Sequence, residues 1–128
     1  MKDRLVGTWL LERFLIESID GEIRDWGRNS KGQLIYTDNG YMSVSINREV
    51  ENKSSIEAQN YFDSILFYSG TFTIDKDIIK HQVANASSPT RIGKELIRYA
   101  KMDGNVLTLT SPKESFGTAI LSWRKVII

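Results

Sequence analysis

The side chains best suited to chemistry in this sequence are one histidine and one arginine. His81 is the only histidine in the chain and alternates with Ile79 and Val83 in the segment IIKHQVAN. Its ordinary pKa of about 6.5 suits proton transfer near neutral pH. Three roles fit this residue: a buried neutral imidazole bonded to a hydroxyl or carbonyl group, a contact to a ligand, or a catalytic acid or base.

Arg98 alternates with Leu96 and Ala100, so it shares an apolar strand face. An isolated charge in such a place is costly, which means that this arginine must be paired or hydrated. One possibility is an internal ion pair with Glu17 on the first strand. The other is that Arg98 holds a carboxylate or enolate oxygen of a ligand through paired hydrogen bonds.

Several kinds of catalytic and cofactor chemistry lack their residues in this sequence. The chain contains no cysteine, no glycine-rich phosphate loop, no Gly-x-Ser-x-Gly motif and no pair of histidines. Asp75 and Asp77 resemble a carboxylate pair, but they flank a hairpin tip, where solvated turn residues are typical. A lone histidine is weak support for haem. We therefore expect no metal, no cofactor and no hydrolytic triad around His81.

Strands must position these side chains, because polar and apolar residues alternate along almost the whole chain. The exception is 54–67, where apolar residues follow helical spacing after a serine suited to an N-cap. Eight antiparallel strands can close into an up-and-down barrel with room for one small ligand. We therefore predict an all-β fold, an eight-stranded antiparallel up-and-down barrel with one short helix. The predicted strands are 8–18, 32–37, 41–47, 67–75, 78–85, 92–102, 105–110 and 118–126.

Turn lengths predict which side chains share the barrel interior, since loop length sets strand register. The first of three consecutive turns places Phe72 opposite His81, and the connection after it places His81 opposite Leu96. A two-residue Asp-Gly loop then places Arg98 opposite Leu109. The predicted inner wall consists of Phe72, Ile74, Ile79, His81, Val83, Leu96, Arg98, Ala100, Leu107 and Leu109.

The hairpin YTDNGYM permits two registers. A three-residue Asp-Asn-Gly loop puts Tyr36 on the same face as Met42 and Val44, whereas a two-residue loop pairs Ile35 with Val44. The first register adds a hydroxyl and a thioether to the cavity, and Asn85 adds an amide. The residues predicted to contact a ligand are Tyr36, Met42, Phe72, Ile79, His81, Asn85, Leu96, Arg98 and Leu109.

The first strand carries two equally apolar faces. Alternation through Trp9 and Leu11 would turn Glu17 inward, towards Arg98. The opposite face carries Phe14 and Ile16 and is as apolar. Periodicity therefore does not choose the inward face of this strand.

Gly7, Thr8 and Trp9 open the first strand, which lies beside the last strand if the barrel closes. The last strand carries Arg124 and Lys125, and either cation could cover the indole of Trp9. Burial of the indole contributes up to roughly 5 kcal/mol at 25 cal/mol per Å². We interpret Gly7, Trp9 and Arg124 as structural residues that close the barrel, with Lys125 as the other candidate to cover the indole.

Four of these patterns together resemble a known family. They are Gly-Thr-Trp, Leu-Ile-Tyr-Thr-x-x-Gly-Tyr-Met, a histidine on a strand, and Gly-x-x-x-x-Arg at 93–98. Over nearly the whole chain, the sequence resembles the lipocalin-like domains of the calycin superfamily, and in particular small bacterial and fungal members without a signal peptide. It departs from the family where a closing Trp-x-Arg becomes Trp-Arg-Lys at 123–125. The resemblance implies a barrel that binds a small hydrophobic or amphipathic molecule, and some relatives look like isomerases or cyclases.

Composition limits the partners of this protein. The 128 residues are 41% hydrophobic and 26% charged, with a formal net charge of +1, as expected of one globular domain over 1–128. The sequence has no basic stripe that would suggest nucleic-acid binding. It also has no run of about 18 apolar residues that would suggest a membrane span. The N-terminus lacks the apolar region of a signal peptide, so we expect a cytoplasmic protein. The sequence does not indicate an oligomeric state.

These observations support a binding function first. The predicted lumen would take a small hydrophobic molecule, with affinity from apolar burial and orientation from the few polar groups. The alternative is an isomerase or cyclase without cofactor, in which His81 moves a proton and Arg98 stabilises an oxyanion. A barrel filled by its own side chains is the third possibility.

Overall fold

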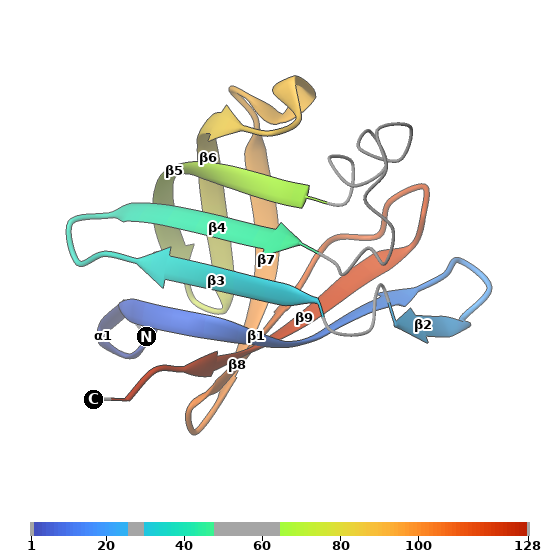
Figure 1. Cartoon of the computed structure of the whole chain (residues 1–128), viewed down its shortest axis with the longest axis horizontal. Helices are drawn as coiled ribbons and strands as arrows, with labels where there is room; N and C mark the ends of the chain where they lie inside the picture. The colour runs from blue at the N-terminus through green and yellow to red at the C-terminus, as the bar shows by residue number, and fades with distance from the viewer. Residues whose placement is uncertain (1, 26–29, 48–64, 128) are drawn as a thin grey trace, which may run out of the picture.

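Antiparallel strands dominate the computed structural model, which describes residues 2–25, 30–47 and 65–127 (Figure 1). Two short helical segments accompany them in these ranges: α1 (Lys2–Leu5) and the 3-10 turn η1 (Pro89–Arg91). The strands are β1 (Gly7–Glu17), β2 (Ile23–Asp25), β3 (Lys31–Tyr36), β4 (Tyr41–Asn47), β5 (Ile65–Asp75), β6 (Ile78–Ala86), β7 (Glu95–Asp103), β8 (Val106–Thr110) and β9 (Thr118–Lys125).

The sheet closes into a barrel because its first and last strands pair. From β3 to β9 each strand pairs with the next one, β1 pairs with β3, and β9 returns to β1. The strand β2 pairs only with the end of β1, as an addition to the closed eight. The predicted eight-stranded antiparallel barrel is therefore confirmed, with one extra strand. In the described ranges, no helix is long and apolar enough to cross a membrane.

The predicted helix at 54–67 lies for the most part outside the described residues. Its last three positions, 65–67, belong to β5, so the prediction was wrong there. The strand predicted to start at 92 starts at Glu95 instead, because η1 and the turn after it occupy the preceding residues. Proline at the first position of η1 favours this turn, since its fixed φ suits a helical start.

The strand registers agree with the sequence at three connections and differ at one. Phe72 pairs with His81, and His81 pairs with Leu96 on its other side, both as predicted. Tyr36 pairs with Met42, which selects the three-residue loop over the two-residue alternative. Arg98 does not pair with Leu109, whose partner is Ala100. The two-residue loop lies one position later than expected, at 104–105, which shifts the partners by two residues. Because a shift of two preserves the face, these side chains still point into the barrel.

A β-bulge resolves which face of β1 points inward. The pairing of β1 with β9 shifts register between Leu11 and Arg13. Trp9 and Leu11 face inward before the bulge, and Phe14 and Ile16 face inward after it, so each apolar face is buried over one half of the strand. Glu17 is consequently exposed and does not reach the interior.

A second bulge separates Asn85 from the cavity. The pairing of β5 with β6 shifts at Gly70, which pairs with Val83 while Ser69 pairs with Asn85. The extra residue reverses the alternation of β6, and Asn85 is exposed. The prediction that its amide faces the lumen was wrong. A Cβ at Gly70 would lie 1.8 Å from the carbonyl oxygen of Gln82, which explains why glycine occupies this position.

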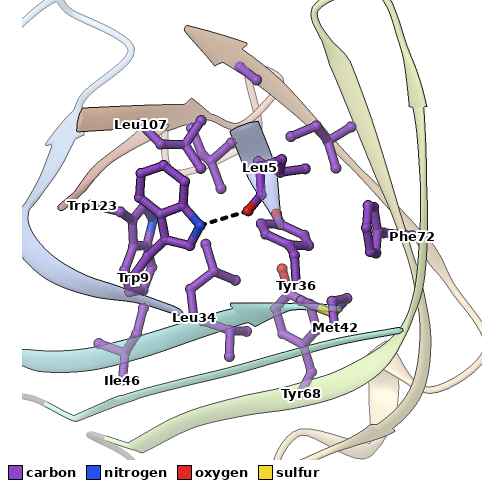
Figure 2. Packing of buried hydrophobic residues seen from close by; sticks show 14 of the residues in the cluster. Leu5, Trp9, Leu34, Tyr36, Met42, Ile46, Tyr68, Phe72, Leu107 and Trp123 are labelled. Atoms are coloured by element: carbon purple, nitrogen blue, oxygen red, sulfur yellow. Dashed lines mark hydrogen bonds between the residues drawn. The ribbon is translucent and has the colours of Figure 1, made fainter. Parts of the chain in front are cut away.

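Lys125, and not Arg124, covers Trp9 at the closed end of the barrel. The Lys125 Nζ lies 5.5 Å from the Trp9 ring centroid, while Arg124 points outward and forms an ion pair with Glu12. The Trp9 Nε1 donates to the carbonyl oxygen of Leu5 over 2.9 Å, which fixes α1 against the indole (Figure 2). A Cβ at Gly7 would lie 2.9 Å from the Lys125 Cε, so glycine leaves room for the lysine stem.

The buried core surrounds this closed end and continues up the inner faces of the strands. Leu5, Trp9, Leu34, Tyr36 and Leu107 are essentially inaccessible to solvent. Figure 2 shows the two tryptophans on one side of this cluster and the aromatic rings of Tyr36, Tyr68 and Phe72 on the other. The other members of the core are Phe14, Met42, Val44, Ile46, Ile79, Val83, Ala100, Leu109 and Trp123.

Candidate functional site

A cavity of about 370 Å³ occupies the barrel interior towards η1 and the connection between β8 and β9. Most of its wall is apolar, and the polar and charged side chains are concentrated on β5, β6, β7, η1 and the neighbouring connections. The apolar lining residues are Phe14, Leu34, Val44, Ile46, Leu66, Leu96, Leu109, Phe116, Ala119, Leu121 and Trp123. The polar ones are Tyr68, His81, Thr90, Arg91, Lys94, Arg98, Ser111 and Glu114.

His81 lies on this wall between two tyrosine hydroxyl groups. Its Nε2 is 2.6 Å from the hydroxyl oxygen of Tyr36, and its Nδ1 is 2.7 Å from that of Tyr68. The three residues come from β6, β3 and β5, and Phe72 packs edge-on against Tyr36 at 4.7 Å between ring centroids. Both ring nitrogens are thus occupied by neutral partners, as in the first of the three roles considered for this histidine.

Burial keeps this triad uncharged. The pKa of His81 is lowered from 6.5 to about 3. The larger cause is burial away from solvent, and the smaller cause is the positive charge of Arg98. Burial raises the pKa of Tyr36 well above its ordinary value, and repulsion between the ionised forms of Tyr36 and Tyr68 raises it further. Burial also raises the pKa of Tyr68, against the charges of Arg98 and Arg91. A histidine with so low a pKa and no free nitrogen is a poor general base near neutral pH, which argues against a direct catalytic role.

Arg98 is the charged side chain that acts on all three residues of this triad. It is half-buried, its Nη1 donates to the carbonyl oxygen of Ile97 over 2.8 Å, and its positive charge acts on the hydroxyl of Tyr68. Within the described ranges no carboxylate forms an ion pair with it, and Glu17 points away. Arg98 therefore keeps hydrogen-bonding capacity towards the cavity, since a guanidinium has five N–H donors.

Four of the nine residues predicted to contact a ligand line the cavity: His81, Leu96, Arg98 and Leu109. Another four, Tyr36, Met42, Phe72 and Ile79, are buried at the closed end, where they support the wall without lining it. Asn85 lies outside. The predicted set thus combined the wall with its supporting layer, because strand alternation gives the face of a residue and not its depth in the barrel.

The sequence interpretation missed Tyr68 and Trp123. Both signals were available: Tyr68 is four positions before Phe72 and so shares its inward face, and Trp123 alternates with Leu121 on the last strand. Phe14 was missed as a lining residue because its face was undetermined without the bulge in β1. In the described part of the chain, no group of three or more His, Asp or Glu residues could hold a metal ion.

Comparison with known proteins assigns the family. Residues 6–126 match the family model described as a lipocalin-like domain, and the chain therefore belongs to the lipocalin-like domain family. No curated protein matches the sequence.

Three solved structures have similar folds at low sequence identity. A redesigned beta barrel is 12% identical with a TM-score of 0.53, and the match covers 98% of this chain and 95% of that chain. A point mutant of the fluorescent protein UnaG is 14% identical with a TM-score of 0.50 and full coverage of both chains. Fatty-acid-binding protein 1 of Echinococcus granulosus is 18% identical with a TM-score of 0.48, covering 98% and 99%. At such identities the likeness concerns the barrel fold.

Proposed function

We propose that this barrel binds one small amphipathic molecule in its cavity. The apolar part would pack against the leucine and aromatic side chains of the wall, and an acidic or carbonyl group would face Arg98. The observation that carries the proposal is an arginine without a carboxylate partner, among the described residues, in an otherwise largely apolar cavity. A ligand oxygen would compensate for the cost of keeping that charge away from bulk water.

The size and lining of the cavity support binding over a filled barrel. A volume of about 370 Å³ falls in the range of small-molecule sites, which combine apolar walls with a few convergent polar groups. Membership of the lipocalin-like family points in the same direction, as does the barrel that it entails. The cytoplasmic location expected from the sequence stays part of the proposal.

The first experiment is native mass spectrometry of protein purified without denaturation, under gentle and then harsh ionisation. A discrete additional mass that is lost on activation would support the proposal and give the ligand mass. Titration with the environment-sensitive dye 1-anilinonaphthalene-8-sulfonate measures binding directly, because the dye combines an aromatic body with an anionic group.

A cavity-filling variant shows whether the dye enters the barrel. Ala119 lines the cavity on β9, so Ala119→Phe should reduce affinity about tenfold or more by occupying its space. Thr73 is exposed on the outside of β5, and Thr73→Phe is the matched control. Equal binding by both variants would place the dye outside the barrel and contradict the proposal.

A further inference from the structure

We propose that the cavity wall presents the Tyr68 hydroxyl and Arg98 as hydrogen-bond donors, and that the ligand meets both with an acceptor-only anionic group such as a carboxylate or enolate. This inference rests on the proposed function and specifies its ligand class. The direction of the two hydrogen bonds at the ring nitrogens of His81 carries it.

Tyr36 fixes the proton position on His81. The Tyr36 hydroxyl is buried, does not line the cavity, and has the His81 Nε2 as its hydrogen-bond partner among the described residues. If Nε2 carried the proton, Tyr36 would accept it and its own O–H would be left without an acceptor. Buried donors without acceptors are costly and rare. Tyr36 therefore donates to Nε2, and the proton of the neutral imidazole sits on Nδ1.

That proton position determines what Tyr68 can do. The Nδ1–H donates to the Tyr68 oxygen over 2.7 Å. The oxygen thus accepts a hydrogen bond from His81, and its own O–H must find another acceptor. Because Tyr68 lines the cavity, the available direction for this donor is towards the ligand.

Trp123 places no hydrogen-bond acceptor in this wall. Its Nε1 is the one buried side-chain polar atom of the described residues that has no hydrogen-bond partner, although the residue is only 1% exposed. The same side chain lines the cavity. An indole N–H can only donate, and this one is covered by protein atoms, so Trp123 offers no acceptor to a ligand. The Ser111 hydroxyl in this wall already donates to the carbonyl oxygen of Pro112 and accepts from the Ala119 N–H.

Charge favours the same ligand class. The charged lining residues are the cations Arg91, Lys94 and Arg98 and one carboxylate, the exposed Glu114. A carboxylate could accept from Tyr68 and Arg98 together and gain from the surplus of positive charge. An ammonium group has only hydrogen-bond donors to offer to Tyr68 and Arg98, and its positive charge is repelled by the cations of the lining. The cavity should therefore discriminate by head group as well as by size.

The imidazole proton can be observed directly. His81 is the only histidine, so long-range nitrogen–proton correlation NMR of labelled protein has one imidazole to report. Protonated and unprotonated ring nitrogens have well-separated ¹⁵N shifts, which identify the tautomer. A proton on Nδ1 is the expected result. A proton on Nε2 would mean that Tyr68 donates to the histidine, and it would overturn the inference.

Three probes with one tail test the head-group preference. Decanoate, decanol and decylammonium would be titrated by displacement of 1-anilinonaphthalene-8-sulfonate at pH 7.5. We expect decanoate to bind at least about tenfold more tightly than decylammonium, since a hydrogen bond to a charged group contributes about 1.5–3 kcal/mol. Equal affinities for all three would overturn the inference and leave the proposed function intact. Failure of every probe and of the dye to bind would count against the proposed function itself.

Two variants separate the roles of the donors. Tyr68→Phe removes one hydroxyl and should weaken decanoate about tenfold while changing decanol and decylammonium by less. Tyr99→Phe on the exposed face of β7 is the matched control. Arg98→Met tests the anion contact in the proposed function. Unchanged decanoate affinity in a folded Tyr68→Phe protein would overturn this inference and leave the proposed function intact. Circular dichroism and urea unfolding establish folding of each variant, and the NMR measurement on the unsubstituted protein still locates the imidazole proton if Tyr68→Phe does not fold.

Discussion

The Lys125 ammonium lies 5.5 Å from the centre of the Trp9 ring and donates a 2.8 Å hydrogen bond to the carbonyl oxygen of Arg4. One side chain thus contacts the first strand and the turn of helix that precedes it. Trp9 contacts the same helix through its bond to Leu5. The last strand, the first strand and α1 are in this way joined at the closed end of the barrel, opposite the cavity.

Lys125→Met should therefore destabilise the protein more than Arg124→Met. Loss of the cation–π contact and of the hydrogen bond to Arg4 is expected to lower the free energy of unfolding by about 1–2 kcal/mol. Arg124 forms an exposed ion pair with Glu12, so its replacement should cost about 0.5 kcal/mol or less. Urea unfolding of both variants measures the difference, and equal losses would contradict the assignment of Lys125.

The choice between these two cations could have been made from the sequence. Side chains alternate along a strand, and Trp123 and Lys125 share a face, whereas Arg124 has the other one. The register confirms this, because Trp9 pairs with Lys125 and the exposed Leu10 pairs with Arg124. The sequence interpretation named Arg124 among the closing residues and left Arg124 and Lys125 as alternatives for the cation over Trp9.

Two β-bulges explain why the inward or outward orientation of some strand residues was not predicted from the sequence. Alternation identified the strands and the inward set around Phe72 and His81, since each apolar face is locally regular. A bulge adds one residue to a strand without changing the composition around it. The inward and outward faces of the strand therefore exchange at the bulge, and the sequence pattern does not show it. Gly70 did offer a signal, because glycine inside a strand often marks a bulge or a close backbone approach. The bulge in β1 has no such marker.

The contacts of the candidate site lie beyond sequence pattern for a different reason. Tyr36, Tyr68 and His81 come from three strands, and their meeting depends on how far up the barrel each residue sits. That height follows from strand tilt and stagger, which hairpin loops alone do not determine. The sequence therefore predicted the faces of Tyr36 and His81 but not the hydrogen bonds between them.

Gly70→Ala should be strongly destabilising. Its Cβ would lie 1.8 Å from the backbone oxygen of Gln82, which cannot move without breaking the ladder between β5 and β6. We expect a loss of about 3 kcal/mol or more in the free energy of unfolding. Thr71→Ala on the exposed face next to it should cost about 1 kcal/mol or less. Similar urea midpoints for the two variants would contradict the close approach at the bulge.

Phe14→Ala tests the reversal of faces in β1. Phe14 is buried beyond the bulge, and removal of its ring should cost about 3 kcal/mol or more. Leu10 is 51% exposed before the bulge, so Leu10→Ala should cost about 1 kcal/mol or less. Thermal or urea unfolding measures both. Without the bulge, both residues would share the outward face and the two losses would be alike.

Acid should destabilise this protein through His81 before the carboxylates titrate. The pKa of His81 is about 3 in the folded state and 6.5 when exposed, so between these values the unfolded chain binds a proton that the folded chain does not. The stability from keeping the imidazole neutral is complete above pH 6.5 and is lost as the pH falls from 6.5 towards 3. Between pH 7.5 and 5.0 we expect a loss of about 2 kcal/mol in urea unfolding. His81→Gln cannot take up this proton, so its stability should change less over the same interval, whatever its value at pH 7.5. In the same samples the ring proton signals of folded His81 should stay constant down to pH 5, and a titration near pH 6.5 would show that the imidazole is not held neutral between the two tyrosines.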